Sequence, residues 1–138
     1  MAIEKQFEKK VEKYLNSIGI YQAGFPSDKM KVKSIGWFTK IWGGGYQKSG
    51  IPDLIICANG FFVSVELKAP KGKPSVLQKM NTTRINQANG VGIILYPDGF
   101  ENFKKLIEGV IGCKSATVEL SVLKDAHSDT KCDIVTEY

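Results

Sequence analysis

Residues 54–68 read LIICANGFFVSVELK, and this stretch decides the fold. Its first half is a short apolar run that ends before Asn59-Gly60, a pair of residues that favours a two-residue β-turn. After the turn, apolar and polar residues largely alternate, which is typical of a strand with one buried face. The same period of two places Glu66 and Lys68 together on the polar face. The stretch therefore predicts a β-hairpin with an acid and a lysine near its open end.

Asp53 follows Pro52 and comes just before the hairpin. Counting outward from the turn, Asp53 falls opposite Glu66, and two carboxylates that face each other across a ladder repel. A bound cation would reverse that cost. Hydrolysis of a phosphodiester uses a divalent cation to neutralise the developing charge and activate a water, and Mg²⁺ prefers oxygen ligands. The cross-strand pair therefore predicts a metal site, whereas the second such dipeptide, Pro97-Asp98, precedes a glycine and is typical of a turn.

Segments on both sides of the hairpin complete the expected fold. Three helices are predicted over residues 3–18, 75–88 and 100–108, a further strand over residues 91–96, and part of residues 31–42 is a candidate for another. The order helix, loop, strand, strand, helix, strand, helix predicts an α/β (α+β) domain with a small mixed sheet flanked by helices. We expect residues 1–109 to form this domain and residues 110–138 to form a C-terminal edge strand or tail.

The composition is that of a globular protein with one core. The chain has 138 residues, of which 43% are hydrophobic and 24% are charged. No apolar run approaches the ~20 residues of a membrane helix, and the first residues lack the core of a signal peptide, so a cytoplasmic location is expected. The three cysteines show no metal-binding spacing. Cys57, at the end of an apolar run, is expected to be a small buried side chain.

Positive charge gathers in the first third of the chain. The net charge is +5, and residues 1–50 contain nine lysines but only four acidic residues. A basic region favours phosphate-rich partners, and between residues 21 and 50 the lysines are interleaved with aromatic residues that can stack on bases. The candidate DNA contacts in this segment and in the later lysine-rich loop are Lys31, Lys33, Trp37, Lys40, Trp42, Lys48, Lys71 and Lys73. For Trp37 and Phe38, packing on the core explains the pattern equally well.

Three linked motifs resemble a known family. They are Gly50-Ile51-Pro52-Asp53-Leu54-Ile55, then Phe62-Val63-Ser64-Val65-Glu66-Leu67-Lys68, then Ser75-Val76-Leu77-Gln78. Together they are similar to the VRR-NUC branch of the PD-(D/E)xK nucleases, over roughly residues 1–107. The resemblance implies a restriction-endonuclease-like core and a Mg²⁺- or Mn²⁺-dependent endonuclease that hydrolyses DNA. It also implies a homodimer acting on branched DNA such as Holliday junctions; small stand-alone members occur in phages and bacteria.

The same resemblance implies a role for each residue at the open end of the hairpin. Asp53 and Glu66 would ligate the metal ion, with the backbone carbonyl of Leu67 as a further ligand. Lys68 would orient or activate the attacking water and stabilise the pentavalent phosphorane. All four residues lie in two of the three motifs.

The family also places a glutamate of the first helix and a glutamine after the hairpin near the metal. Glu8 is our first choice for the catalytic, metal-ligating glutamate of the helix, with Glu4 as the alternative and Glu12 less favoured. A solvated helix face balanced by lysines is the simpler explanation for any one of these glutamates. Gln78 would be the supporting glutamine, and Ser75 and Gln78 also have the spacing of a capping box.

Other interpretations stay open at this point. A catalytically silent or partner-dependent DNA-binding module would keep the same fold without cutting. A structural protein could carry the pattern by chance. The preferred substrate is also open among junctions, flaps and single strands, because the basic segment 21–50 is longer than the family pattern requires and such loops contact DNA.

Overall fold

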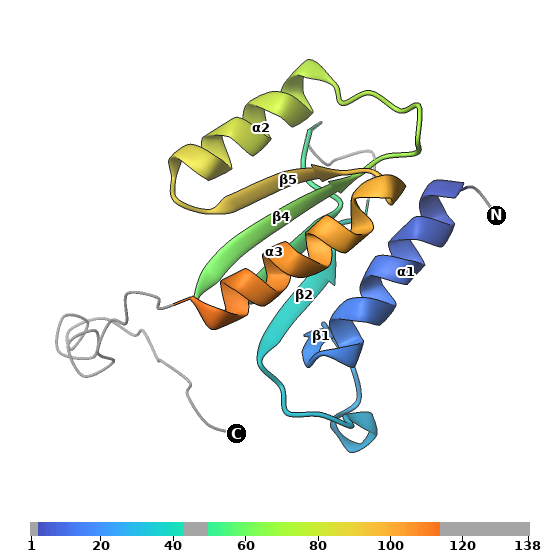
Figure 1. Cartoon of the computed structure of the whole chain (residues 1–138), viewed down its shortest axis with the longest axis vertical. Coiled ribbons are helices and arrows are strands. Elements are labelled where there is room, and N and C mark those ends of the chain that lie inside the picture. The colour runs from blue at the N-terminus through green and yellow to red at the C-terminus, as the bar shows by residue number, and fades with distance from the viewer. Residues whose placement is uncertain (1–2, 43–49, 114–138) are drawn as a thin grey trace, which may run out of the picture.

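Five strands form one mixed sheet that is flanked by helices (Figure 1). The structure is a computed structural model that describes residues 3–42 and 50–113. The strands are β1 (Ile20–Gln22), β2 (Gly36–Lys40), β3 (Leu54–Ala58), β4 (Phe61–Leu67) and β5 (Val91–Leu95). The helices are α1 (Ile3–Ser17), α2 (Val76–Gln87) and α3 (Phe100–Gly112), with short 3₁₀ turns η1 (Ser27–Lys29) and η2 (Pro97–Gly99). The expected α+β class, a mixed sheet with helices around it, is confirmed.

The strands follow the order of the sequence, β1-β2-β3-β4-β5. The two outer pairs, β1 with β2 and β4 with β5, are parallel, and the inner pairs are antiparallel. The hairpin of β3 and β4 turns at Asn59 (φ 52°) and Gly60 (φ 79°), the two positive φ angles that a type I′ turn needs. Leu54 pairs with Val65, so the next residues outward along the hairpin are Asp53 and Glu66. The predicted register is therefore confirmed.

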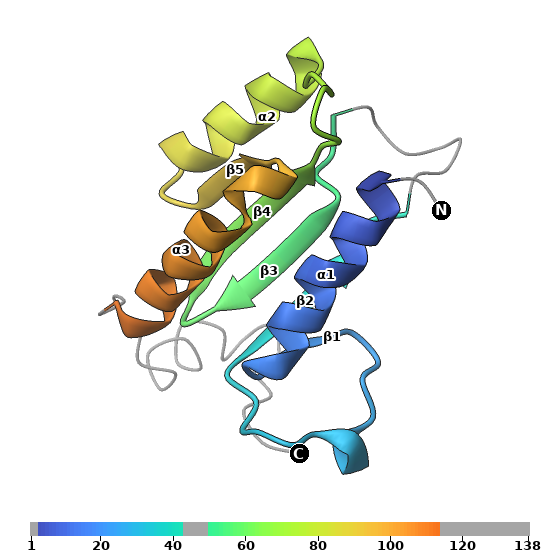
Figure 2. The ribbon, with the colours of Figure 1, turned by 45° about the vertical axis from the view of Figure 1, so that its right-hand side comes forward.

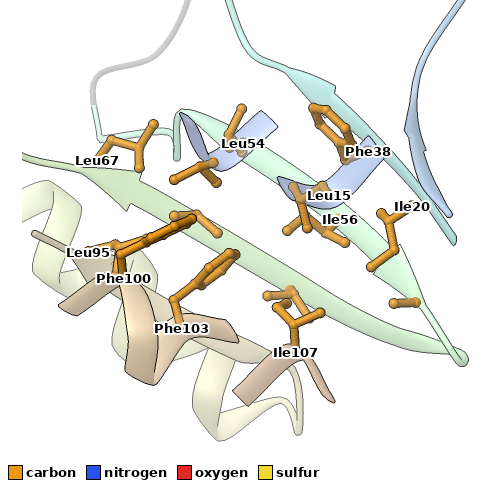
Figure 3. Close-up of a cluster of buried hydrophobic side chains, with 14 of the residues drawn as sticks. Leu15, Ile20, Phe38, Leu54, Ile56, Leu67, Leu95, Phe100, Phe103 and Ile107 are labelled. Carbon is orange, nitrogen blue, oxygen red and sulfur yellow. The ribbon is translucent and has the colours of Figure 1, made fainter. Parts of the chain in front are cut away.

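One face of the sheet is covered by α1 and α3, which lie side by side on it (Figure 2). Their apolar stripes meet the inward side chains of the strands, and together they form the main core (Figure 3). The helices contribute Phe7, Val11, Leu15, Phe100, Phe103, Ile107 and Val110, and the strands contribute Ile20, Phe38, Leu54, Ile56, Ala58, Val63, Val65, Leu67 and Leu95. Burial of this apolar surface is the main favourable contribution to folding.

The opposite face of the sheet is only partly covered, by α2 beside β5. The helix approaches so closely that a Cβ added to Gly92 would lie 2.8 Å from the carbonyl oxygen of Thr82. Farther from α2, Trp37, Cys57 and Phe62 are neighbours across three strands, and all three are exposed. The expectation that Cys57 is buried is wrong, because strand alternation turns its side chain away from the core.

Two elements differ from the expected boundaries. The short strand β1 was not expected; it begins directly after Gly19 (φ 93°), which ends the turn that follows α1. Helix α3 continues past residue 108, because Val110 packs into the core and the Asn59 side-chain amide donates to the Val110 carbonyl oxygen at 2.9 Å. The expected C-terminal edge strand or tail lies, from residue 114 onward, outside the described residues. Within the two described ranges, no helix is long and apolar enough to span a membrane.

Candidate active site

Asp53 and Glu66 lie together at the open end of the hairpin. The Leu67 backbone N–H donates to Asp53 Oδ2 at 2.7 Å, which holds the aspartate side chain against the neighbouring strand. Glu66 is only 5% exposed, although it is an acidic residue. Its neighbours along the strand, Val65 and Leu67, face the core, so Glu66 faces the side of the sheet on which α2 lies. Two carboxyl groups are thus held close to each other with little solvent around one of them.

Two polar side chains contact the Glu66 carboxyl group. Gln78 Nε2 donates to Glu66 Oε1 at 2.8 Å. Lys68 Nζ lies 3.9 Å from the same oxygen. The Lys68 backbone N–H donates to the Leu95 carbonyl at 2.9 Å, which continues the pairing of β4 with β5 by one residue and fixes the lysine backbone. The structure therefore brings together four of the residues that the sequence singled out.

The start of α2 positions Gln78. Ser75 Oγ accepts from the Gln78 backbone N–H at 3.1 Å, and the Ser75 backbone N–H donates to Gln78 Oε1 at 2.8 Å. These two bonds form a capping box, which satisfies N–H groups that the first helical turn leaves free. The side-chain oxygen of Gln78 thus caps the helix, and its amide nitrogen donates a hydrogen bond to Glu66. The two expected roles of this residue are compatible in one rotamer.

The pKa of Glu66 is raised from its ordinary value of 4.5 to about 8, and burial is the largest cause. The charge of Asp53 and a side-chain hydrogen bond to it contribute to this increase, while the ammonium of Lys68 opposes it by less. The raised pKa favours the protonated form of Glu66 at neutral pH, because burial and the neighbouring carboxyl group of Asp53 both disfavour a second negative charge. Lys68 Nζ, 3.9 Å from Glu66 Oε1, offsets part of this increase in pKa.

Glu4 is the helix glutamate whose charge acts on this pair. It lies in the first turn of α1, and its carboxylate raises the pKa of Glu66. Glu8, one turn further along, is held instead by Lys40, whose Nζ lies 2.6 Å from Glu8 Oε1. Glu4 is also closer than Glu8 to the N-terminal end of α1, which is the end of this helix nearer the open end of the hairpin (Figure 1).

Two carboxyl groups form the set of donors that a divalent cation would meet at this site. Among residues 3–42 and 50–113, no cluster of three or more His, Cys, Asp and Glu side chains is close enough to hold a metal ion. Mg²⁺, however, is commonly held by one or two carboxylates, with waters and substrate phosphates completing six oxygen ligands. Asp53 and Glu66 supply two adjacent carboxyl groups, and a cation beside them would favour their ionised forms. The residues present therefore fit Mg²⁺ or Mn²⁺.

The structure divides the candidate DNA contacts into two groups. Lys40 pairs with Leu54, so Lys40 and Trp42 lie at the open end of the hairpin, near Asp53. Lys71 and Lys73 lie at the same end, in an exposed loop that the Tyr96 hydroxyl holds by donating to the Gly72 carbonyl at 2.8 Å.

The second group lies toward the other end of the sheet. Gly36, at the start of β2, pairs with Ala58 beside the hairpin turn, so Lys31 and Lys33 precede β2 at the end of the sheet away from Asp53. Trp37 is exposed on the partly covered face, while its neighbour Phe38 is buried in the core. Packing on the core is thus confirmed for Phe38 only. Lys48 lies outside the described residues.

No family model, curated protein or solved structure matches the chain.

Proposed function

We propose that the protein is a Mg²⁺- or Mn²⁺-dependent deoxyribonuclease that hydrolyses phosphodiester bonds at the Asp53–Glu66 pair. The observation that carries the proposal is a pair of adjacent carboxyl groups, Glu66 buried and Asp53 half-buried, with a lysine beside them. Two adjacent carboxyl groups, one of them buried, are costly for folding, and the hydrogen bonds that they accept from the Leu67 N–H and the Gln78 amide do not remove the cost of placing one acid beside another. The arrangement becomes favourable when a cation binds between the acids, which supports a metal-dependent reaction.

Each residue of the site has a role in this proposal. Asp53 and Glu66 would hold the cation, with the Leu67 carbonyl as a further ligand, and the cation would supply charge neutralisation and an acidified water. The Leu67 N–H keeps Asp53 oriented, and the Gln78 amide keeps Glu66 oriented. Lys68 would orient the attacking water and stabilise negative charge on the phosphorane.

Glu4 is our preferred helix glutamate in this mechanism. Its carboxylate acts on Glu66, whereas the carboxylate of Glu8 is occupied by Lys40. A restriction-endonuclease-like PD-(D/E)xK core and membership of the VRR-NUC branch belong to the same proposal, and the mixed sheet with the acid pair at the end of a hairpin supports them. A homodimer that cuts branched DNA symmetrically is part of it as well, because two-fold symmetry suits paired cuts in a four-way junction.

Metal removal tests the proposal directly. Labelled four-way junction, flap, linear duplex and single-stranded DNA would each be incubated with the protein in Mg²⁺, Mn²⁺ or EDTA, and the products resolved on a denaturing gel. We expect cleavage of at least one substrate with either metal and none in EDTA. Paired symmetric nicks in the junction would add support for a dimeric junction-cutting enzyme, and sedimentation of the free protein would measure the dimer. Tight DNA binding without cleavage of any substrate would favour the silent binding module instead.

The two roles of Gln78 can be separated by mutation. Ser75→Ala removes the cap but leaves the Gln78 amide, so we expect it to lower the free energy of unfolding by about 1 kcal/mol with little effect on the cleavage rate. Gln78→Glu keeps an oxygen acceptor for the Ser75 N–H but replaces the amide donor to Glu66 by a third carboxyl group, so we expect slower cleavage and a loss of stability that grows as the pH rises. Thermal melts and single-turnover cleavage measure the two effects. Equal cleavage by Gln78→Glu and the unmodified protein would show that Gln78 serves only the helix.

A further inference from the structure

Trp42 lies at the same end of the sheet as the acid pair, but on the opposite face. Strand alternation places Phe38, Lys40 and Trp42 on the face that α1 covers, and Phe38 is indeed in the core. The Ile41 backbone N–H donates to the Asp53 carbonyl oxygen at 2.8 Å, so the residue immediately before Trp42 is bonded to the residue that begins the site. The backbone of Trp42 is therefore held at the same end of the sheet as Asp53, because Trp42 directly follows the residue that makes this hydrogen bond.

The ring of Trp42 is in contact with a lysine on one face and is otherwise largely exposed. It is 75% exposed, the largest exposed fraction for any aromatic residue within the described ranges. Lys40 Nζ lies 4.2 Å from the ring centroid, and the same atom is 2.6 Å from Glu8 Oε1. The ammonium thus occupies one face of the indole and is itself fixed by an acid. With most of its surface exposed, the ring keeps its opposite face available for a second flat group.

A hollow of about 360 Å³ adjoins the ring, between α1 and the end of β2. This volume is in the range of pockets that bind small flat ligands. Its wall carries the Glu12 carboxyl and the Gln22 amide, which lie 3.4 Å apart and are groups of the kind that hydrogen-bond base edges. Lys5 and Lys9 lie at the same hollow and provide positive charge for a sugar-phosphate backbone.

We propose that Trp42 stacks on an unpaired base of the DNA strand that is cut at the Asp53–Glu66 pair. Aromatic side chains stack on bases of any sequence, provided that one face of the base is free. Bases inside a continuous duplex are covered on both faces by their neighbours, so the stacked base must belong to a single strand, a flap or an opened branch point. This inference rests on the proposed nuclease function and names its substrate class: DNA with unpaired nucleotides next to the scissile bond.

The test compares binding of the full chain to two labelled DNAs of the same sequence, a flap and a blunt duplex, by fluorescence anisotropy in EDTA. We expect Trp42→Leu to weaken binding to the flap by about tenfold and to change binding to the duplex less than about twofold. Trp42→Phe keeps an aromatic ring and should retain most of the affinity. Phe62→Leu, which removes another exposed aromatic ring on the opposite face, is the matched control and should bind both DNAs like the unmodified protein.

A fluorescent base analogue reports the stacking itself. With 2-aminopurine in the flap, the unmodified protein should quench its emission on binding, and Trp42→Leu should lose this quenching when enough protein is added to saturate the flap. An equal loss of affinity for flap and duplex, or unchanged quenching, would overturn the inference. Cleavage in Mg²⁺, run in parallel, separates the two proposals. If DNA is cut but Trp42→Leu has no selective effect, the stacking inference fails and the proposed nuclease function is retained. If the protein neither binds nor cuts any of the DNAs, both proposals are wrong.

Discussion

Replacing Asp53 by asparagine is expected to slow DNA cleavage by about a hundredfold or more, with the fold and DNA binding largely intact. Asparagine keeps an oxygen that can accept from the Leu67 N–H, which lies 2.7 Å from the present carboxylate, so the local geometry has no reason to change. The substitution removes the negative charge that a cation needs at this position. Single-turnover cleavage in saturating protein would measure the effect without interference from product release.

The chain contains a matched control for this experiment. Asp98 also follows a proline, but it is exposed and lies in the 3₁₀ turn η2. Asp98→Asn makes the same chemical change in the same dipeptide, and we expect it to leave cleavage unchanged. Cleavage by Asp53→Asn at the rate of the unmodified protein would contradict the proposed function, provided that the variant has the melting temperature of the unmodified protein.

Replacing Glu66 by glutamine is expected to stabilise the metal-free protein at alkaline pH while abolishing cleavage. The pKa of Glu66 is about 8 in the folded protein against an ordinary value of 4.5, so folding favours the protonated form. The free energy of unfolding therefore falls as the pH rises from about 5 through 8, because the buried acid must ionise beside Asp53. Glutamine stays neutral at every pH. Its amide can donate to Asp53 while its oxygen still accepts from Gln78.

Thermal melting in EDTA at several pH values measures this effect. At pH 9 we expect Glu66→Gln to exceed the unmodified protein in stability by on the order of 2 kcal/mol, and at pH 5 we expect the two to be nearly equal. Added Mg²⁺ should raise the melting temperature of the unmodified protein more than that of the variant, because binding stabilises only a folded state that has the ligands. Glu108→Gln, at an exposed position of α3, controls for loss of one negative charge. A variant less stable than the unmodified protein at pH 9 would contradict the raised pKa of Glu66.

The hairpin and its acid pair were predictable from the sequence because their signals are local. The Asn59-Gly60 turn and the alternation after it determine the register, and the register brings Asp53 opposite Glu66. Gln78 was also predictable, since its spacing from Ser75 identifies the start of the helix that carries it.

The features that sequence missed depend on distant parts of the chain. Strand β1 has only three residues and is a strand because it pairs in parallel with β2, more than ten residues away. The choice between Glu4 and Glu8 depends on Lys40, which reaches α1 only through the placement of β2. Helical periodicity gives both glutamates the same face, so it could not decide between them. The exposure of Cys57 could not be predicted, because an apolar run does not show that one face of its strand is left uncovered.

The position of the acid pair at the open end of the hairpin also bears on folding kinetics. A hairpin closes from its turn outward, so Ala58 meets Phe61 early and Asp53 meets Glu66 last. The repulsion between the two acids is then absent from most of the transition state for folding. Changes at the pair should therefore act mainly on the unfolding rate and leave the folding rate almost unchanged. The acid pair is thus one of the last parts of the hairpin to form during folding.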